Sequence, residues 1–353
     1  MIFGRSFIRL CSAPRFTGMV LVGLLAIAVG WSGRAYSADA PPSLEPAVGA
    51  RGRLGCLSDP TRVSRLVIDS PGLVENVLVD GDWAGRSLVK INADRVTLRH
   101  CEIRNARHNG IAVEASDVLI DSCRIHHLLK GTSQQPEDAH GITGCARRLV
   151  IRNCEIFLVS GDAVQFDPDR GPWDDVLIER CTFWTGPLES DWAGFRQADR
   201  PGENAVDTKQ QAANSRSRLV IRDCLFHGWR GGFIKNQAAL NLKNHVEVTV
   251  SGCVFRDNDI CFRLRGGAGE RGGARVRIDN CALYDSNVAL RMEDGIRDLK
   301  IDRLGIGEGI RRPYKVARGI GPGFEQTGTF RPVPFEQAVA LGVTPLTPER
   351  PGI

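Results

Sequence analysis

Hydrophobic and polar positions alternate in short runs along this chain, and one run returns seven times between residues 94 and 285. Each copy has a charged or polar start, apolar residues at every second position, a residue suited to a bend, and then the pattern Cys-x-apolar. Alternation with a period of two is typical of short β-strands. The seven copies are DRVTLRHCEIRN, SDVLIDSCRIHH, RRLVIRNCEIFL, DDVLIERCTFWT, SRLVIRDCLFHG, HVEVTVSGCVFRD and ARVRIDNCALYD.

Each copy predicts two short strands that meet at a tight corner. In LVIRNCEIF the alternation breaks at Arg152 and Asn153, just before Cys154. The position before the cysteine holds Asn, Asp or Gly in several copies, and these residues tolerate the left-handed backbone conformation that such a corner needs.

A third apolar run follows every copy after a polar stretch of variable length. Three short strands joined by one tight corner and two loops of free length describe one coil of a parallel β-helix, so we predict an all-β solenoid. The predicted third strands are NGIAVE from residue 109, HGITG from 140, DAVQFD from 162, NAVDTK from 204, GFIKNQ from 232, DICFRL from 259 and NVALRM from 287.

On these repeats, residues 60 to 310 resemble the right-handed parallel β-helix superfamily, which includes pectate-lyase-like and polygalacturonase-like proteins. The resemblance implies a right-handed solenoid whose third-strand face and flanking loops hold a polysaccharide. Long insertions flank that face before His140 and between Cys181 and Asn204. Trp184 and Trp192 lie in the second insertion, where they can stack on sugar rings or fasten the loop to the solenoid.

The cysteines of the seven copies share one predicted inward position on successive coils. Small apolar thiols stack well, so we expect a buried thiol ladder; a disulfide framework is the alternative in an exported protein. Cys56, Cys145 and Cys261 lie outside the ladder and have no assigned partner. The ladder consists of Cys101, Cys123, Cys154, Cys181, Cys224, Cys253 and Cys281.

The first 40 residues differ in kind from the repeats. Arg5, Arg9 and Arg15 precede the apolar run from Met19 to Trp31, and AYSADA then offers small-residue cleavage sites. This order predicts a signal peptide over residues 1–40, because thirteen apolar residues are short for a membrane span of ~20; an uncleaved membrane anchor is the alternative. We therefore expect a secreted or periplasmic protein with no membrane attachment after cleavage.

Cleavage after Ser37 removes four arginines and lowers the formal net charge from +5 to +1. A nearly neutral chain has no general attraction for nucleic acid, so we expect none as a partner, and we expect a monomer. The β-helix with its N-terminal cap is predicted over residues 41–310. A Gly/Pro-rich tail over residues 311–353, with a short helix at PFEQAVALGV, is expected to pack along the solenoid or to cap it.

Aligned third strands place outward residues of successive coils about 4.8 Å apart. Acidic and basic side chains then lie side by side, which is typical either of a cleft for an acidic polysaccharide or of a solvated sheet face with paired charges. One predicted column is Gln165, Asp207 and Lys235, and the next is Glu114, Cys145, Asp167, Lys209, Gln237, Arg263 and Arg291.

Cleavage of a uronate polymer by β-elimination needs carboxylates for a cation such as calcium, a base, and further cations for the polymer's acidic groups. The predicted calcium ligands are Asp162, Asp167, Glu203 and Asp207. The predicted catalytic residues are Lys209, Lys235 and Asp207. The predicted substrate-binding residues are Arg263, Arg265, Arg291, Trp184, Trp192 and His140.

Other functions fit the same face. An inverting hydrolase would use a carboxylate pair among Asp162, Asp167 and Asp207, although the Gly-His-Gly turn of polygalacturonase-like enzymes is missing. The segment FDPDR is similar to the Asp-Pro-His-Asp motif of mannuronan epimerases but lacks its histidine. A carbohydrate-binding surface without catalysis would carry the same loops and charges.

Overall fold

The computed structural model describes residues 54–166, 171–210, 216–267, 272–317, 323–326 and 328–330, together with residues 332 and 335. The chain divides into two compact units, Met1–Ser43 and Leu44–Ile353, and every described residue lies in the second. The predicted signal peptide falls outside the described residues, as does the predicted helix at 334–343 apart from Phe335.

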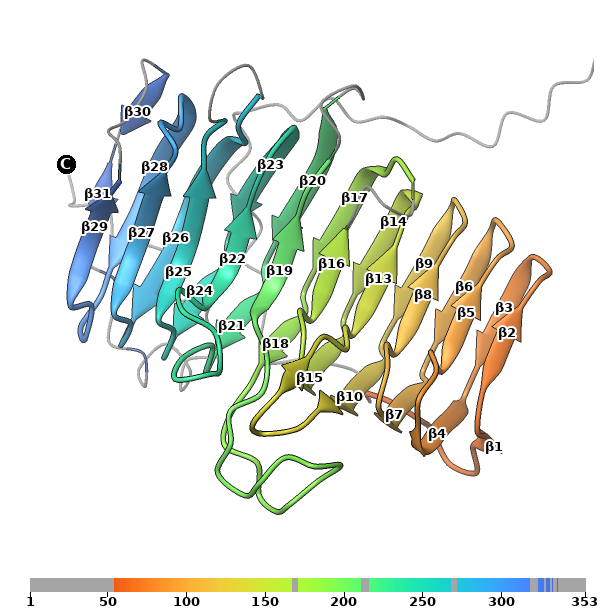
Figure 1. The fold of residues 1–353 in the computed structure, drawn as a ribbon. Coiled ribbons are helices and arrows are strands. Elements are labelled where there is room, and N and C mark those ends of the chain that lie inside the picture. Colours follow the sequence, from red (N-terminus) through yellow and green to blue (C-terminus); the bar gives the residue numbers. More distant parts are fainter. Residues whose placement is uncertain are drawn as a thin grey trace, which may run out of the picture. The chain divides into compact units, whose positions relative to one another are not determined.

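The described residues form a solenoid of parallel strands, in which each strand pairs with its counterpart in the next coil (Figure 1). The third strands of the coils form a ten-stranded sheet, which we name sheet B. Its strands, in order, are β2 (Leu66–Ile68), β5 (Val89–Ile91), β8 (Ile111–Val113), β13 (Ile142–Gly144), β16 (Val164–Phe166), β19 (Asn204–Thr208), β22 (Ala238–Leu242), β25 (Ile260–Arg265), β27 (Val288–Glu293) and β29 (Arg312–Val316).

The first and second strands of each coil form two further rows, joined into one nineteen-stranded sheet, sheet A, because β26 and β28 run through the corner without a break. The first row is β3 (Gly72–Glu75), β6 (Val96–Arg99), β9 (Val118–Asp121), β14 (Arg147–Arg152), β17 (Asp174–Glu179), β20 (Ser217–Arg222), β23 (Val246–Ser251), β26 (Arg275–Tyr284), β28 (Asp298–Ile306) and β30 (Phe324–Gln326). The second row is β1 (Thr61–Val63), β4 (Val77–Ala84), β7 (Glu102–Ala106), β10 (Arg124–Leu128), β15 (Glu155–Val159), β18 (Thr182–Trp184), β21 (Leu225–His227), β24 (Val254–Arg256), the second halves of β26 and β28, and β31 (Thr329–Phe330). A small antiparallel pair, β11 (Lys130–Gly131) with β12 (Pro136–Glu137), lies in the insertion before His140.

The predicted corners are confirmed. The residue before each ladder cysteine has a positive φ between 51° and 63°, in the left-handed region. The seven residues include not only asparagine, aspartate and glycine but also histidine, serine and arginine, so packing of the coils holds this conformation even where the side chain disfavours it. The residues are His100, Ser122, Asn153, Arg180, Asp223, Gly252 and Asn280.

The predicted cysteine ladder is also present in the interior. All seven ladder cysteines are buried with the inward valines, leucines and isoleucines in one core. The backbone N–H of Cys123 donates to the Sγ of Cys154 at 3.4 Å, and Cys154 and Cys181 repeat the contact toward the next coil. Phenylalanines stack in the same way, with Phe226 5.0 Å from the ring centroids of Phe183 and Phe255.

One predicted third strand is wrong. GFIKNQ, residues 232–237, is a loop, and the strand of that coil is the following β22. Asn236 has a φ of 64°, which interrupts the extended backbone that a strand requires. The loop closes on itself because the Gly232 N–H donates to Gln237 Oε1 at 3.0 Å, while Gln237 Nε2 donates to the Gly202 carbonyl at 2.8 Å. Six residues are therefore inserted ahead of the strand.

Strands continue past the predicted end of the solenoid at residue 310. β29 pairs with β27, and β30 and β31 both pair with β28. Beyond them, the ring of Phe335 lies 5.6 Å from that of Tyr284 and beneath the guanidinium of Arg256 at 4.2 Å. This part of the predicted tail thus packs against the second row of sheet A.

Candidate functional site

The outward face of sheet B carries one column of side chains that are polar or charged, with one alanine among them. Inward residues of its strands, such as Val206 and Leu240, belong to the core. Because side chains alternate along a strand, the next residue on each strand, such as Asp207 or Asn241, points outward. The register places Asn241, and not Lys235, beside Asp207, and it places Arg263 and Arg291 in the same column as Asp207 rather than in the next one. The column reads Lys90, Ala112, Thr143, Gln165, Asp207, Asn241, Arg263, Arg291 and Lys315.

Asp207 forms an ion pair that sequence reasoning missed. The Nζ of Lys243, just beyond β22, donates to Asp207 Oδ2 at 2.7 Å. Asp207 is only 3% exposed, and within the described part of the chain its Oδ1 has no hydrogen-bond partner. Burial raises the pKa of Asp207 above its usual value, although Lys243, Lys209 and Arg263 act in the opposite direction. Asp207 therefore has one buried oxygen that no hydrogen-bond donor among the described residues contacts.

Asp162, two residues before β16, is fully buried, and the charges of Asp207 and Lys243 act on it. Its Oδ1 accepts from Asn204 Nδ2 at 2.8 Å and its Oδ2 from Gln165 Nε2 at 3.0 Å. Burial, together with the charges of Asp207 and Glu203, raises the pKa of Asp162 well above its usual range. Burial and the two neighbouring carboxylates thus both favour the protonated form of Asp162, while the hydrogen bond from Asn204 favours the ionised form.

The predicted substrate-binding residue His140 contacts Asp162. The backbone N–H of Asp162 donates to His140 Nδ1 at 2.9 Å, and the same nitrogen lies 3.7 Å from Asp162 Oδ2. Because Nδ1 accepts a hydrogen bond, a neutral ring carries its proton on Nε2. His140 is 8% exposed, so its clearest role in the structure is to fix the turn that leads into β16.

Glu203 precedes β19 at the edge where the strands of sheet B begin. Burial, with the charges of Asp138 and Asp207, raises the pKa of Glu203 to about 7, although Lys243 and Lys209 oppose this rise. A carboxyl group with such a pKa is partly protonated and partly ionised at neutral pH. It can therefore act there as an acid or as a base.

The predicted arginines gather on the same face around one carboxylate. Arg263 donates to both oxygens of Glu293, at 3.2 Å and 3.1 Å, and Arg291 also contacts Glu293. Arg265 lies 3.6 Å from Glu293 and donates to Asp294 at 2.8 Å. Burial acts to raise the pKa of Glu293, but the three arginines outweigh it and hold that pKa below its usual value. Three guanidinium groups share two carboxylates, which leaves a net positive charge.

Of the two lysines predicted to be catalytic, one lies beside sheet B and the other lies away from it. Lys209 directly follows β19, its N–H donates to the Phe166 carbonyl at 3.2 Å, and its charge acts on both Glu203 and Asp207. Lys235 is exposed in the 232–237 loop and is not on the sheet. The neighbouring Asn236 accepts a hydrogen bond from Arg291, so this loop reaches toward the arginines.

The two predicted tryptophans do not join this face. Trp184 lies on β18 of sheet A, where it stacks 4.4 Å from Phe157, and its Nε1 donates to Glu155 at 3.0 Å. Trp192 packs 5.8 Å from Trp83, a residue of β4 in sheet A. The structure thus supports the alternative in which these rings fasten the long insertion to the solenoid.

Among the four residues predicted as calcium ligands, the three that the structure describes do not form a calcium site. Within the described ranges, no three His, Cys, Asp or Glu side chains converge as metal ligands. The ammonium of Lys243 already lies against Asp207 Oδ2, and Asn204 and Gln165 engage both oxygens of Asp162. The fourth predicted ligand, Asp167, lies outside the described residues. The surroundings of Asp162 and Asp207 thus do not fit a calcium ion.

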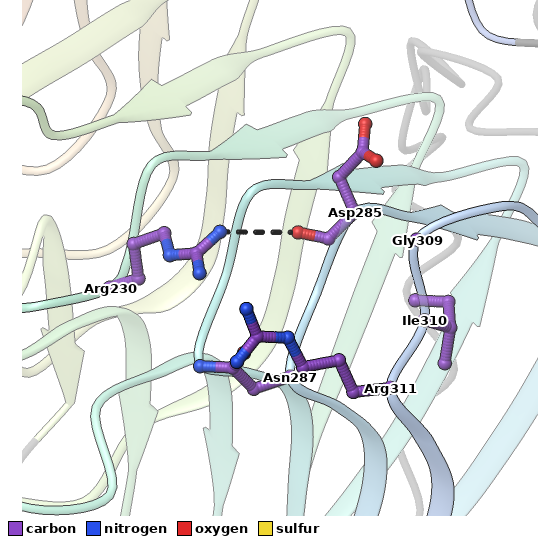
Figure 2. A pocket seen from close by; sticks show the side chains of 6 residues that line it. All are labelled: Arg230, Asp285, Asn287, Gly309, Ile310 and Arg311. Atoms are coloured by element: carbon purple, nitrogen blue, oxygen red, sulfur yellow. Dashed lines mark hydrogen bonds between the residues drawn. The ribbon is translucent and has the colours of Figure 1, made fainter.

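One cavity, of about 410 Å³, lies elsewhere on the solenoid and shares no lining residue with the cluster around Asp207. It opens near the beginnings of β27 and β29 and is shown in Figure 2.

Comparison with known proteins agrees with this architecture. Residues 75–189 match a family described as "Right handed beta helix region". The described residues thus form a right-handed parallel β-helix. No curated protein sequence matches it. Within the described residues, we find no helix with the length and apolar character that crossing a membrane requires.

Solved structures that resemble the chain are distant. An alginate lyase from Paenibacillus sp. str. FPU-7 is 12% identical, with a TM-score of 0.48, and the match covers 76% of this chain and 87% of the lyase. A pectate lyase, Pel9A, is 12% identical, with a TM-score of 0.47 and coverage of 84% and 78%. An endo-xylogalacturonan hydrolase from Aspergillus tubingensis is 12% identical, with a TM-score of 0.44 and coverage of 76% and 79%.

Proposed function

We propose that this protein binds an acidic polysaccharide along the outward face of sheet B and cleaves it by β-elimination. The observation that carries the proposal is the buried Asp207–Lys243 ion pair, with Glu203 at the leading edge of the same sheet and Arg263 two strands further along. Acid–base groups and cations together on one face are what the reaction needs.

The cations would bind and activate the substrate. The carboxylate of a uronate unit makes the neighbouring C–H only weakly acidic, and positive charge beside it stabilises the anion that forms when the proton leaves. Lys243 and Arg263 flank Asn241 and would supply that charge. The surplus charge on Arg265 and Arg291 would hold acidic groups of adjacent sugar units.

Glu203 would remove the proton. In its ionised form it accepts the proton from the carbon next to the carboxylate, a C=C bond forms, and the C–O bond to the leaving sugar breaks with its electron pair on oxygen. Lys209, whose charge acts on Glu203, would supply a proton to that oxygen. Glu203, predicted as a metal ligand, thus takes the role of base in this proposal, and Lys235 has no role in it.

Hydrolysis is the second candidate, because Glu203 has a neighbouring carboxylate. In that reaction protonated Glu203 would donate to the glycosidic oxygen while Asp207, paired with Lys243, would activate a water molecule. The two reactions use Glu203 in opposite protonation states.

We also propose that the protein is exported, which rests on the arginines and apolar run of residues 1–40.

The test is to incubate the purified protein with pectate, alginate and glycosaminoglycans, with added calcium or with a chelator. We expect ultraviolet absorbance from unsaturated products on one of these polymers, at a rate that the chelator leaves unchanged. New reducing ends without absorbance would replace the lyase with the hydrolase. Binding without either product would leave a non-catalytic carbohydrate-binding protein. A rate that requires calcium would restore the predicted metal site.

A further inference from the structure

The cavity of Figure 2 has walls from three loops that are distant in sequence. Arg230 precedes β22, Asp285 and Asn287 precede β27, and Gly309 to Arg311 precede β29. Its volume of about 410 Å³ is within the range of small-ligand pockets, ~300–1,000 Å³.

The acidic side chains around the cavity are already engaged. Asp285 accepts from Arg256 Nε at 3.2 Å through its carboxylate, and Asp259 accepts from Asn287 Nδ2 at 2.6 Å. Gly309 has a φ of 72°, and a Cβ at this position would lie 2.2 Å from Asp285 Oδ1. A glycine is therefore required where this loop passes Asp285 and closes one wall of the cavity.

The basic side chains are oriented toward the space between the loops. Arg230 Nη1 donates to Asp257 at 2.6 Å and to the Asp285 carbonyl at 3.4 Å, which fixes its guanidinium at the cavity (Figure 2). Arg311 is exposed, and in the described part of the chain its side chain has no ion pair or hydrogen bond. Arg230 is already paired with Asp257, so Arg311 is the guanidinium group at the cavity that can bind a carboxylate, with Arg230 beside it.

The cavity lies on the same edge of sheet B as Glu203. Between β19, which follows Glu203, and β29, which follows Arg311, there are four strand spacings. At ~4.8 Å each, this is about 19 Å along the solenoid. An acidic polymer lying along the sheet would reach the cavity several sugar units away from the cleaved bond.

We propose that the Arg230–Arg311 cavity binds the carboxylate of a uronate unit distant from the cleavage point. The proposal rests on the proposed function for the identity of the polymer. The cavity would be a binding site separate from the one around Lys243 and Glu203.

The test compares Arg311→Gln with wild type and with Arg107→Gln. Arg107 is an exposed arginine in the loop before β8, on the same edge but far along the solenoid, and it serves as the matched control. Titration calorimetry measures the affinity of each protein for a galacturonate hexamer, for a galacturonate dimer and for a neutral galactose hexamer. Turnover is measured in parallel on the same preparations.

We expect Arg311→Gln to weaken hexamer binding about tenfold, the size of a lost charged hydrogen bond, with no change for the dimer or the neutral sugar. Arg107→Gln is expected to bind like wild type. Equal hexamer affinity in Arg311→Gln and wild type would overturn the cavity proposal, as would equal weakening in both variants. Arg311-dependent binding without any turnover would instead overturn only the proposed lyase activity.

Discussion

Asp207 and Lys243 are 36 positions apart in the sequence, yet their side chains form a 2.7 Å ion pair between neighbouring coils. Because the aspartate is buried, removing either partner should lower the free energy of unfolding. Breaking such a pair leaves a buried charge without a counter-ion, which is more unfavourable than losing an exposed ion pair.

Replacing Lys243 with methionine should therefore affect both stability and activity. We expect the free energy of unfolding at pH 8 to fall by about 3 kcal/mol, because Asp207 is left without a counter-ion. Turnover of the uronate polymer should fall at least ~100-fold, even at temperatures where the variant is folded. Urea unfolding and the ultraviolet assay measure the two effects.

Lys235→Met is the matched control for that change. Lys235 is exposed in its loop, so its loss should alter the free energy of unfolding by less than ~0.5 kcal/mol and leave turnover intact. Wild-type turnover in Lys243→Met, or lost turnover in Lys235→Met, would reverse the assignment of the essential lysine.

The raised pKa of Glu203 predicts how stability depends on pH. Since the pKa rises from 4.5 to about 7 on folding, the folded state holds this proton more tightly than the unfolded state. Glu203 therefore contributes stability that is fully present below pH 4.5 and is lost as the pH rises through about 7. Glu203→Gln cannot ionise, so its free energy of unfolding should decline less than that of wild type between pH 5 and pH 8.

The same group predicts the pH dependence of the rate. If Glu203 is the base of a β-elimination, the rate should rise with pH through about 7; if it is the acid of a hydrolysis, the rate should fall there. Asp138→Asn removes a negative charge that raises the pKa of Glu203, so the transition should move to lower pH in this variant. A rate profile that is the same in Asp138→Asn and Glu203→Gln as in wild type would exclude Glu203 from proton transfer.

Glu293 should stabilise the arginine cluster at neutral pH. Its pKa is held low, so its contribution is present at pH 7 and is lost as the pH falls through that lowered pKa. We expect Glu293→Gln to lower the free energy of unfolding by about 2–3 kcal/mol at pH 7, since hydrogen bonds from Arg263 lose their charged acceptor. Unfolding curves at pH 7 and pH 3 test this, and an equal difference at both values would contradict it.

The corner before each ladder cysteine can be tested at Asn280, whose φ is 51°. Asn280→Gly should leave the free energy of unfolding within about 0.5 kcal/mol of wild type, because glycine adopts this conformation freely. Asn280→Val should lower it by about 1–2 kcal/mol or more, because a β-branched residue is strained there. Equal stability of the two variants in denaturant would show that the corner does not depend on left-handed backbone.

The sequence by itself determined the coil. Alternation with a period of two, the corner before each cysteine and the inward cysteine position are all local features. They recur in seven copies, so the one wrongly predicted third strand, at residues 232–237, did not change the predicted fold. Six of the seven predicted third strands and the buried ladder follow from this repetition.

Only the tertiary structure decided which side chains meet on sheet B. Neighbours across strands are fixed by the register between coils, and a six-residue insertion before β22 moved Asn241 beside Asp207 and brought in Lys243 in place of Lys235. A shift by an even number of residues leaves the apolar pattern of each strand intact, so the pattern cannot predict it. The burial that raises the pKa of Glu203, and the grouping of loops that line the Arg230–Arg311 cavity, likewise arise from segments that come together only in the folded chain.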